Sequence, residues 1–226
     1  MQNTYLAKRE RLENYFNEVS SDAWDKLTSN EPVSYVRQLV REGREKMQEA
    51  IIEKLPNDLK GTRILDAGCG TGVLSRMLDE RGAEVVGVDI SEKLIEVAKN
   101  RSRSSGNIEY FAGDMKEKSF GNFDYIVAMD SLIHYSPEDV ISSIAEFSKR
   151  ANYSVLFTVI PSTFALRTKL SLGKYFPKSE RSPEVVPIEW GQLRQLEDLK
   201  INACLEKIKR IKSFFYVSEV WELANK

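Results

Sequence analysis

Three glycines at alternate positions, Gly68, Gly70 and Gly72, follow a short apolar stretch that ends near Asp66. Glycine allows a backbone to approach a ligand closely and to adopt a positive φ. The next residue, Val73, begins an apolar pattern typical of a helix, and the free N–H groups of a helix N-terminus attract anionic or polar groups. The NAD fingerprint G-x-G-x-x-G needs a third glycine where Val73 stands. The loop therefore predicts a site for another nucleotide, the alternative being a turn that binds nothing.

Further acids follow the predicted apolar strands. Asp89 ends one strand about 20 residues after the glycine loop, where a carboxylate accepts hydrogen bonds from both ribose hydroxyls. Asp114 follows the next strand, and Asp130 ends the one after it. Because ligands of a doubly wound sheet bind beyond the carboxyl ends of its strands, we expect these acids to face one ligand.

The single histidine, His134, lies just after Asp130. It is a candidate to orient an acceptor or to carry a proton, and the alternative is a strand-end histidine satisfied by backbone groups. Arg37, Arg41 and Arg44 recur at helical spacing and form one cationic stripe. That stripe is either a solvated helix face or the place where an arginine binds a carboxylate, of a cofactor or of an acidic substrate.

Strands and helices alternate between residues 62 and 160, which predicts an α/β fold with a doubly wound, mostly parallel sheet and helices on both faces. A closing antiparallel pair, 204–212 and 213–221, makes seven strands. The chain divides into four expected segments: an N-terminal helical arm (1–60), a nucleotide-binding core (61–160), a flap inserted after the fifth strand (161–188), and a closing helix with the strand pair (189–226).

The flap is punctuated by four prolines, with apolar and basic residues interleaved. A connection this long is usually functional or disordered, and its apolar content argues against disorder. We therefore expect it to cover the strand ends, with large apolar side chains available to a flat ligand: Phe164, Leu170 and Phe176.

Composition excludes several classes. The chain of 226 residues has a net charge of −1, which gives no electrostatic case for nucleic acid. No apolar run approaches the roughly 18 residues of a membrane span, and the first residues do not form a signal peptide. Two cysteines and one histidine leave no plausible zinc site. These features favour a cytoplasmic protein that binds no metal of its own.

The glycine loop with Asp66 resembles motif I of the Rossmann-like S-adenosylmethionine methyltransferases. Beyond that motif, nearly the whole chain resembles the magnesium-protoporphyrin IX methyltransferases of (bacterio)chlorophyll biosynthesis. The matching segments are 15–16 with Trp24, 32–34, 40–44, 65–72, 88–91, 113–115, 123–133 and 176–183. There is one departure: oxygenic members carry a tyrosine near the position of Thr28, thought to act beside a histidine that matches His134, and this chain has none there.

The resemblance implies transfer of a methyl group from S-adenosylmethionine to a propionate of magnesium-protoporphyrin IX, photosynthetic pigment chemistry in which the magnesium arrives with the substrate. It implies His134 as the catalytic residue. The implied cofactor-binding residues are Arg44, Asp66, Gly68, Cys69, Gly70, Gly72, Asp89, Ile90, Asp114, Met115 and Asp130. The implied substrate-binding residues are Arg41, Tyr135, Phe164, Leu170 and Phe176. A magnesium chelatase is the suggested partner for porphyrin hand-over, with peripheral membrane contact allowed.

A propionic acid titrates near pH 4.3, so the acceptor is already ionised at neutral pH. Catalysis then consists of holding a carboxylate oxygen in line with the sulfonium methyl and excluding water, with His134 orienting the carboxylate or taking a proton if the acid binds neutral. A phenol acceptor, as in a quinol, would need a general base, for which His134 is the sole histidine. A non-catalytic cofactor-binding or porphyrin-carrying module is the remaining alternative.

Overall fold

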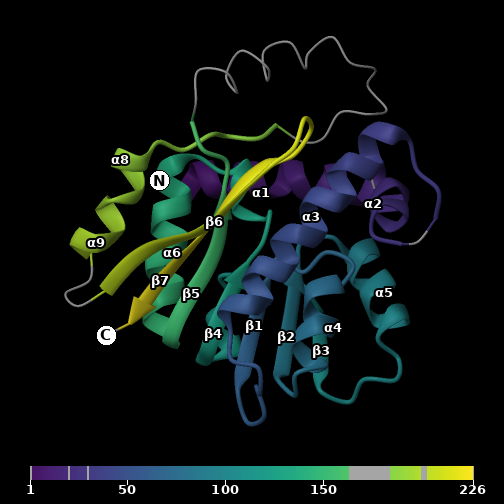
Figure 1. Cartoon of the computed structure of the whole chain (residues 1–226), viewed down its shortest axis with the longest axis horizontal. Helices are drawn as coiled ribbons and strands as arrows, with labels where there is room; N and C mark the ends of the chain where they lie inside the picture. The colour runs from purple at the N-terminus through teal and green to yellow at the C-terminus, as the bar shows by residue number, and fades with distance from the viewer. Residues whose placement is uncertain (1, 20, 30, 163–183, 200–202, 226) are drawn as a thin grey trace.

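A seven-stranded sheet forms the centre of the molecule in this computed structural model, which describes residues 2–19, 21–29, 31–162, 184–199 and 203–225 (Figure 1). The strand order is β3-β2-β1-β4-β5-β7-β6. The first five strands are parallel, and β7 pairs antiparallel with both β5 and β6. The strands are β1 (Arg63–Ala67), β2 (Glu84–Asp89), β3 (Ile108–Ala112), β4 (Phe123–Ala128), β5 (Ala151–Val159), β6 (Ala203–Lys212) and β7 (Val217–Asn225). The predicted α/β fold is confirmed.

Helices cover both faces of this sheet. Alternate residues of a strand point to opposite faces, so Leu65 of β1 packs toward α6 while its neighbour Ile64 packs toward α3 and α4. Figure 1 shows α3 and α4 in front of the sheet and α6 behind it. The α-helices are α1 (Gln2–Asn14), α2 (Ser21–Leu27), α3 (Tyr35–Lys54), α4 (Val73–Asp79), α5 (Glu92–Arg101), α6 (Pro137–Arg150), α8 (Trp190–Leu193) and α9 (Gln195–Leu199). Shorter turns of helix are η1 (Tyr15–Val19, π), η2 (Lys118–Phe120, 3-10) and η3 (Leu132–His134, 3-10).

Side-chain caps fix where three helices begin. Ser34, Ser91 and Ser136 each accept a hydrogen bond from the backbone N–H three residues later, at the starts of α3, α5 and α6. Pro137 is the first residue of α6, where its missing N–H is tolerated. These three helices begin where the sequence predicts, because a capping residue acts only on the next few residues.

The last strand was predicted to begin at residue 213, which is wrong. Ser213 and Tyr216 close a tight turn, with the Ser213 N–H donating to the Tyr216 carbonyl at 2.7 Å, and β7 begins one residue later. Aromatic residues favour strands, yet here they occupy the turn, and Tyr216 is buried beneath α3. The flap residues Phe164, Leu170 and Phe176 lie outside the described residues. Its flanks come together where Pro161 pairs with Ile188.

Among the residues that the structure describes, no helix has the length and hydropathy needed to cross a membrane. Within the same residues, no group of three or more histidine, cysteine or acidic side chains could hold a metal ion.

Candidate active site

A cavity of about 920 Å³, counting the space that opens to solvent, lies beyond the carboxyl ends of β1, β2, β3 and β4. Its wall comes from four strand ends and from the N-terminal helices, which lie across the same edge of the sheet in Figure 1. The strand-end lining includes Asp66, Gly68, Cys69, Gly70, Thr71, Asp89, Ile90, Gly113, Met115, Asp130, Ser131, His134 and Tyr135. The arm contributes Tyr5, Leu12, Phe16, Trp24, Thr28, Arg44 and Gln48.

The glycine loop passes closely over two neighbouring side chains. Gly68 has φ of 85°, and an added Cβ would lie 2.2 Å from the Cβ of Ser131. Gly72 has φ of 72°, and an added Cβ would lie 2.3 Å from the hydroxyl of Tyr110. Any side chain at either position would clash, and it would also be strained because the backbone there has a positive φ. Gly72 does not line the cavity, so its need for glycine comes from packing on Tyr110.

Asp89 presents a carboxylate held by the backbone. Its two oxygens accept hydrogen bonds from the N–H groups of Gly70 and Ser91, each at 2.9 Å. Burial raises its pKa, and the two backbone donors oppose that rise. A carboxylate offers about four lone-pair sites. Asp89 therefore keeps acceptor capacity toward the cavity, which suits a ribose diol.

Asp66 lies fully buried at the end of β1 and also lines the cavity. Its carboxylate accepts a hydrogen bond from the Ser75 hydroxyl at 2.6 Å. Burial raises the pKa of Asp66 to about 6, although the bond from Ser75 lowers it. Asp66 therefore titrates close to neutral pH in this structure.

An ion pair forms the wall at the end of β4. The Arg44 guanidinium lies 2.6 Å from Asp130 Oδ2 and 4.8 Å from the ring centroid of Trp24. Asp130 has φ of 53°, and its carboxylate also accepts from Thr158 and Tyr216. Adjacent positive and negative groups match an amino acid zwitterion. Sequence reasoning missed Tyr216, because nothing local links a hairpin aromatic to an acid 86 residues earlier.

His134 is buried in η3 and lines the cavity. Its Nδ1 lies 3.0 Å from the backbone carbonyl oxygen of Glu184. Since a carbonyl only accepts, Nδ1 carries the proton and the neutral ring keeps its lone pair on Nε2. Burial lowers the pKa of His134, partly offset by that carbonyl and by Asp130. The ring is therefore a neutral proton acceptor at pH 7.

Among the residues that the structure describes, three predicted site residues lie outside the cavity wall: Gly72, Asp114 and Arg41. The Asp114 carboxylate accepts from the Tyr5 hydroxyl at 2.8 Å and pairs with Arg9 at 3.0 Å, so it anchors α1, while its neighbours Gly113 and Met115 line the cavity. Tyr5 also stacks on Tyr135, with ring centroids 4.9 Å apart. The sequence could not show that α1 would cover this strand end.

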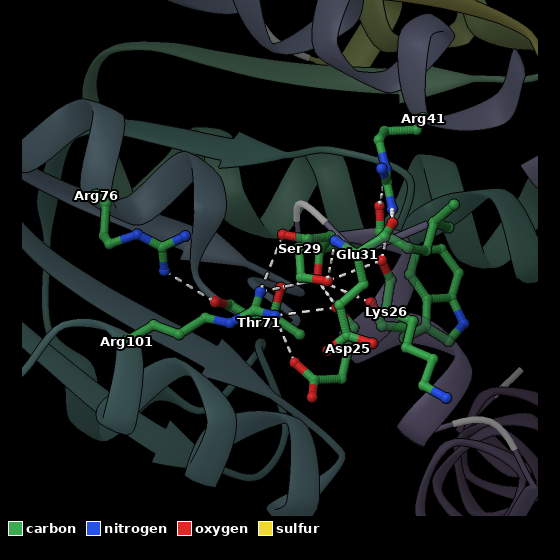
Figure 2. Close-up of polar contacts among 11 residues, drawn as sticks. Asp25, Lys26, Ser29, Glu31, Arg41, Thr71, Arg76 and Arg101 are labelled. Carbon is green, nitrogen blue, oxygen red and sulfur yellow. Dashed lines mark hydrogen bonds and ion pairs between the residues drawn. The ribbon is translucent and has the colours of Figure 1, made fainter. Parts of the chain in front are cut away.

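Arg41 is the third of these residues. Its guanidinium donates to the carbonyl oxygens of Lys26, Leu27 and Glu31 at 2.7–2.9 Å, so it closes the C-terminal end of α2 and does not reach the cavity (Figure 2). Helical spacing places Arg41 and Arg44 on one face of α3, but it does not predict a shared ligand, because the two arginines bind different neighbours.

A polar latch joins α2 to the glycine loop and α5, and sequence reasoning missed it. Arg101 donates to the carbonyls of Asp25 and Thr28 at 3.0 Å each and pairs with the Asp25 carboxylate (Figure 2). Thr71 of the loop donates to the Thr28 hydroxyl at 2.7 Å, and Arg76 donates to the Thr71 carbonyl. Thr28 thus lines the cavity at the point where some relatives are expected to carry tyrosine.

The strand order, the glycine loop and the acids at consecutive strand ends define a Rossmann-like class I methyltransferase fold. A model described as a methyltransferase domain matches residues 64–151, and one described as the magnesium-protoporphyrin IX methyltransferase C-terminus matches residues 128–225. The chain is 44% identical to the magnesium-protoporphyrin O-methyltransferase of Rhodobacter capsulatus over 225 residues, covering 98% of this chain and 99% of that one. The chain belongs to the magnesium-protoporphyrin O-methyltransferase family.

Other similarities agree with this family. The magnesium-protoporphyrin O-methyltransferase of Synechocystis is 27% identical over 87% of each chain. A crystal structure of the Synechocystis magnesium protoporphyrin IX methyltransferase with bound SAH has the same fold, with a TM-score of 0.85, 24% identity, and coverage of 96% of this chain and 99% of that one. A ubiquinone biosynthesis O-methyltransferase of Coxiella burnetii is 35% identical over 153 residues, covering 66% of this chain and 61% of that one.

Proposed function

We propose that this protein transfers the methyl group of S-adenosylmethionine to a propionate carboxylate of magnesium-protoporphyrin IX, giving the monomethyl ester and S-adenosylhomocysteine. The observation that carries the proposal is the single cavity in which the glycine loop, Asp89 and the Arg44–Asp130 pair meet. Similarity to magnesium-protoporphyrin O-methyltransferases along the whole chain supports the choice of acceptor.

The chemistry of the cavity residues supports this choice of cofactor. Asp89 is a buried acceptor suited to the ribose hydroxyls. Ile90 and Met115 offer apolar contacts to an adenine ring. Arg44 and Asp130 would receive the carboxylate and ammonium of the methionine end. Asp66, Gly68, Cys69 and Gly70 form the wall of the cavity at the glycine loop. Gly72 acts on the cavity through its packing on Tyr110, and Asp114 through its hydrogen bond and ion pair to α1.

The cofactor would supply a methyl group made electrophilic by a sulfonium. In the transfer, a carboxylate oxygen forms the new O–C bond as the S–C bond breaks and its electron pair stays on sulfur. The carboxylate loses no proton if it binds ionised. If the propionic acid binds neutral in this buried site, the His134 Nε2 lone pair takes its proton, a role that the Glu184 carbonyl makes available by holding the other nitrogen.

Tyr135 is the described residue that we assign to the acceptor side of the cavity. Tyr135 lines the cavity and stays a phenol, because burial raises its pKa. Arg41 has no place in this assignment, since it does not line the cavity and donates to carbonyl groups at the end of α2. Cover by the flap residues 164, 170 and 176, hand-over from a magnesium chelatase and peripheral contact with a membrane are predictions of the resemblance alone.

The decisive experiment incubates the chain with methyl-labelled S-adenosylmethionine and one acceptor at a time. Magnesium-protoporphyrin is expected to take the label, whereas metal-free protoporphyrin and a quinol are expected to take little. Preferred labelling of the quinol would replace this proposal with the second candidate, which the partial similarity to a ubiquinone biosynthesis O-methyltransferase favours. The pH–rate profile separates the two independently, because a phenol acceptor gives a steep rise at alkaline pH and a carboxylate does not.

A further inference from the structure

Tyr216, near the C-terminus, contacts Asp130, which is a residue of the cavity wall. It lies in the turn before β7, and its ring fills the space beside Gly43 of α3. A Cβ added at Gly43 would lie 2.6–2.8 Å from three atoms of the Tyr216 side chain, so only glycine admits the ring there. The Tyr216 hydroxyl lies 3.1 Å from each carboxylate oxygen of Asp130. Since Tyr216 does not line the cavity, it acts there through Asp130.

The hydroxyl of Tyr216 is a hydrogen-bond donor to this carboxylate. Burial, together with the negative charge of Asp130, raises the pKa of Tyr216 well above its ordinary value, so the phenol keeps its proton. Thr158 adds a second contact, donating to Asp130 Oδ1 at 3.2 Å and accepting the Asp130 N–H at 2.7 Å. These two side chains hold Asp130 in its left-handed conformation, which non-glycine residues adopt infrequently.

The held carboxylate in turn fixes Arg44. Asp130 Oδ2 lies 2.6 Å from the Arg44 guanidinium, and that guanidinium also lies over the ring of Trp24. Both members of the ion pair line the cavity. Without the Tyr216 hydroxyl, the Asp130 side chain loses a donor and can turn, and Arg44 loses a fixed partner.

We propose that Tyr216, admitted by Gly43, is a positioning residue that holds the Asp130–Arg44 pair in the geometry that binds the amino acid end of S-adenosylmethionine. The inference rests on the proposed function for the identity of the cofactor. It adds to that function a role for the C-terminal hairpin, which supplies no side chain of its own to the cavity among the described residues.

The test compares two nucleosides that differ only at the methionine end. S-Adenosylhomocysteine carries the amino acid carboxylate and ammonium, and 5′-methylthioadenosine lacks both. Calorimetry on Tyr216→Phe and on Gly43→Ala is expected to show about tenfold weaker S-adenosylhomocysteine binding, the size of one lost hydrogen bond to a charged group. Binding of 5′-methylthioadenosine is expected to stay within about twofold. In methyl transfer, the KM for S-adenosylmethionine rises about tenfold while kcat at saturation changes little.

Matched controls make the same two substitutions elsewhere in the chain. Tyr153→Phe takes a hydroxyl from an exposed tyrosine of β5, and Gly191→Ala adds a Cβ where nothing lies within 4 Å. Both are expected to bind the two nucleosides as the parent chain does. If Gly43→Ala does not fold, Tyr216→Phe, which deletes one oxygen, decides alone.

Two results would overturn the inference: equal weakening of both nucleosides, which marks a structural role, or no weakening of either. If the parent chain binds both nucleosides and Tyr216→Phe weakens only S-adenosylhomocysteine, but magnesium-protoporphyrin is not methylated, the proposed acceptor is refuted and the role of Tyr216 stands. Failure of the parent chain to bind either nucleoside would refute both.

Discussion

The hydroxyls of Thr28 and Thr71 lie 2.7 Å apart, joining the end of α2 to the glycine loop across 43 residues of sequence. The Thr28 hydroxyl donates to the Trp24 carbonyl and accepts from Thr71 and Arg101. Because Thr28 and Trp24 both line the cavity, this contact makes the N-terminal arm part of the cofactor site. The first prediction concerns that latch.

Replacing Arg101 with glutamine is expected to loosen α2 over the cavity. The change removes hydrogen bonds to Asp25 and Thr28 and leaves two carbonyls at the helix end without this donor. Hydrogen exchange of the Thr28 and Ser29 amides is expected to speed up about tenfold, and S-adenosylhomocysteine is expected to dissociate faster. The control is Arg103→Gln, an exposed arginine on the same turn. Unchanged exchange would show that the latch is not what holds α2.

Asp89→Ala is expected to weaken S-adenosylhomocysteine binding tenfold or more. A bidentate carboxylate that accepts from ribose hydroxyls contributes on the order of 1.5–3 kcal/mol. Calorimetry measures the loss, and the control variant is Asp58→Ala, which removes an exposed carboxylate. Methylthioadenosine binding is expected to fall in parallel, because the ribose is common to both nucleosides. Full affinity in Asp89→Ala would remove Asp89 from the ribose site.

His134→Gln is expected to lower kcat by about 10²-fold or more while leaving S-adenosylhomocysteine affinity unchanged, if proton acceptance by Nε2 contributes to turnover. Burial depresses the pKa of His134 below 6.5, so the neutral ring predominates at pH 7 and is lost only as pH falls through that lower pKa. In the parent chain, kcat should be level at and above pH 6.5 and decline only as pH falls through the lowered pKa of His134. The variant should lack this acid limb; equal loss of turnover and cofactor affinity would contradict the assignment.

Asp66→Asn is expected to stabilise the ligand-free protein at neutral pH. The pKa of Asp66 is raised from 3.8 to about 6 in the folded chain, so the contribution of Asp66 to stability is greatest below pH 3.8 and is lost as pH rises through 6. The loss corresponds to about 3 kcal/mol. The variant should therefore unfold at a higher Tm than the parent at pH 7.5, with the gap closing toward pH 4. A gap independent of pH would place the effect elsewhere than in ionisation.

Local patterns predicted most of the fold. Ser91 and Ser136 begin helices because a cap needs only the next few residues, and β2 was predicted with both of its ends because its apolar run is short and bounded. The glycine loop and Asp89 could be placed at one edge because parallel strands put their carboxyl ends together. These features follow from sequence neighbours and from sheet topology.

Long-range contacts could not be predicted in this way. Asp114 was expected to face adenine, but Tyr5 and Arg9 of α1 hold its carboxylate. Arg41 was expected to bind substrate, but its donors close the end of α2. Both outcomes depend on where the N-terminal arm packs, which single-chain periodicity does not encode.

The position of β7 between β5 and β6 affects how the sheet is completed during translation. The ribosome makes β6 before β7, so β6 has no neighbour in the sheet until β7 has emerged and inserted between the two. The turn that carries Tyr216 joins β6 to β7, so its hydrogen bonds to Asp130 require this last part of the sheet to be in place. The support for the amino acid subsite is therefore the last part of the site that the ribosome makes.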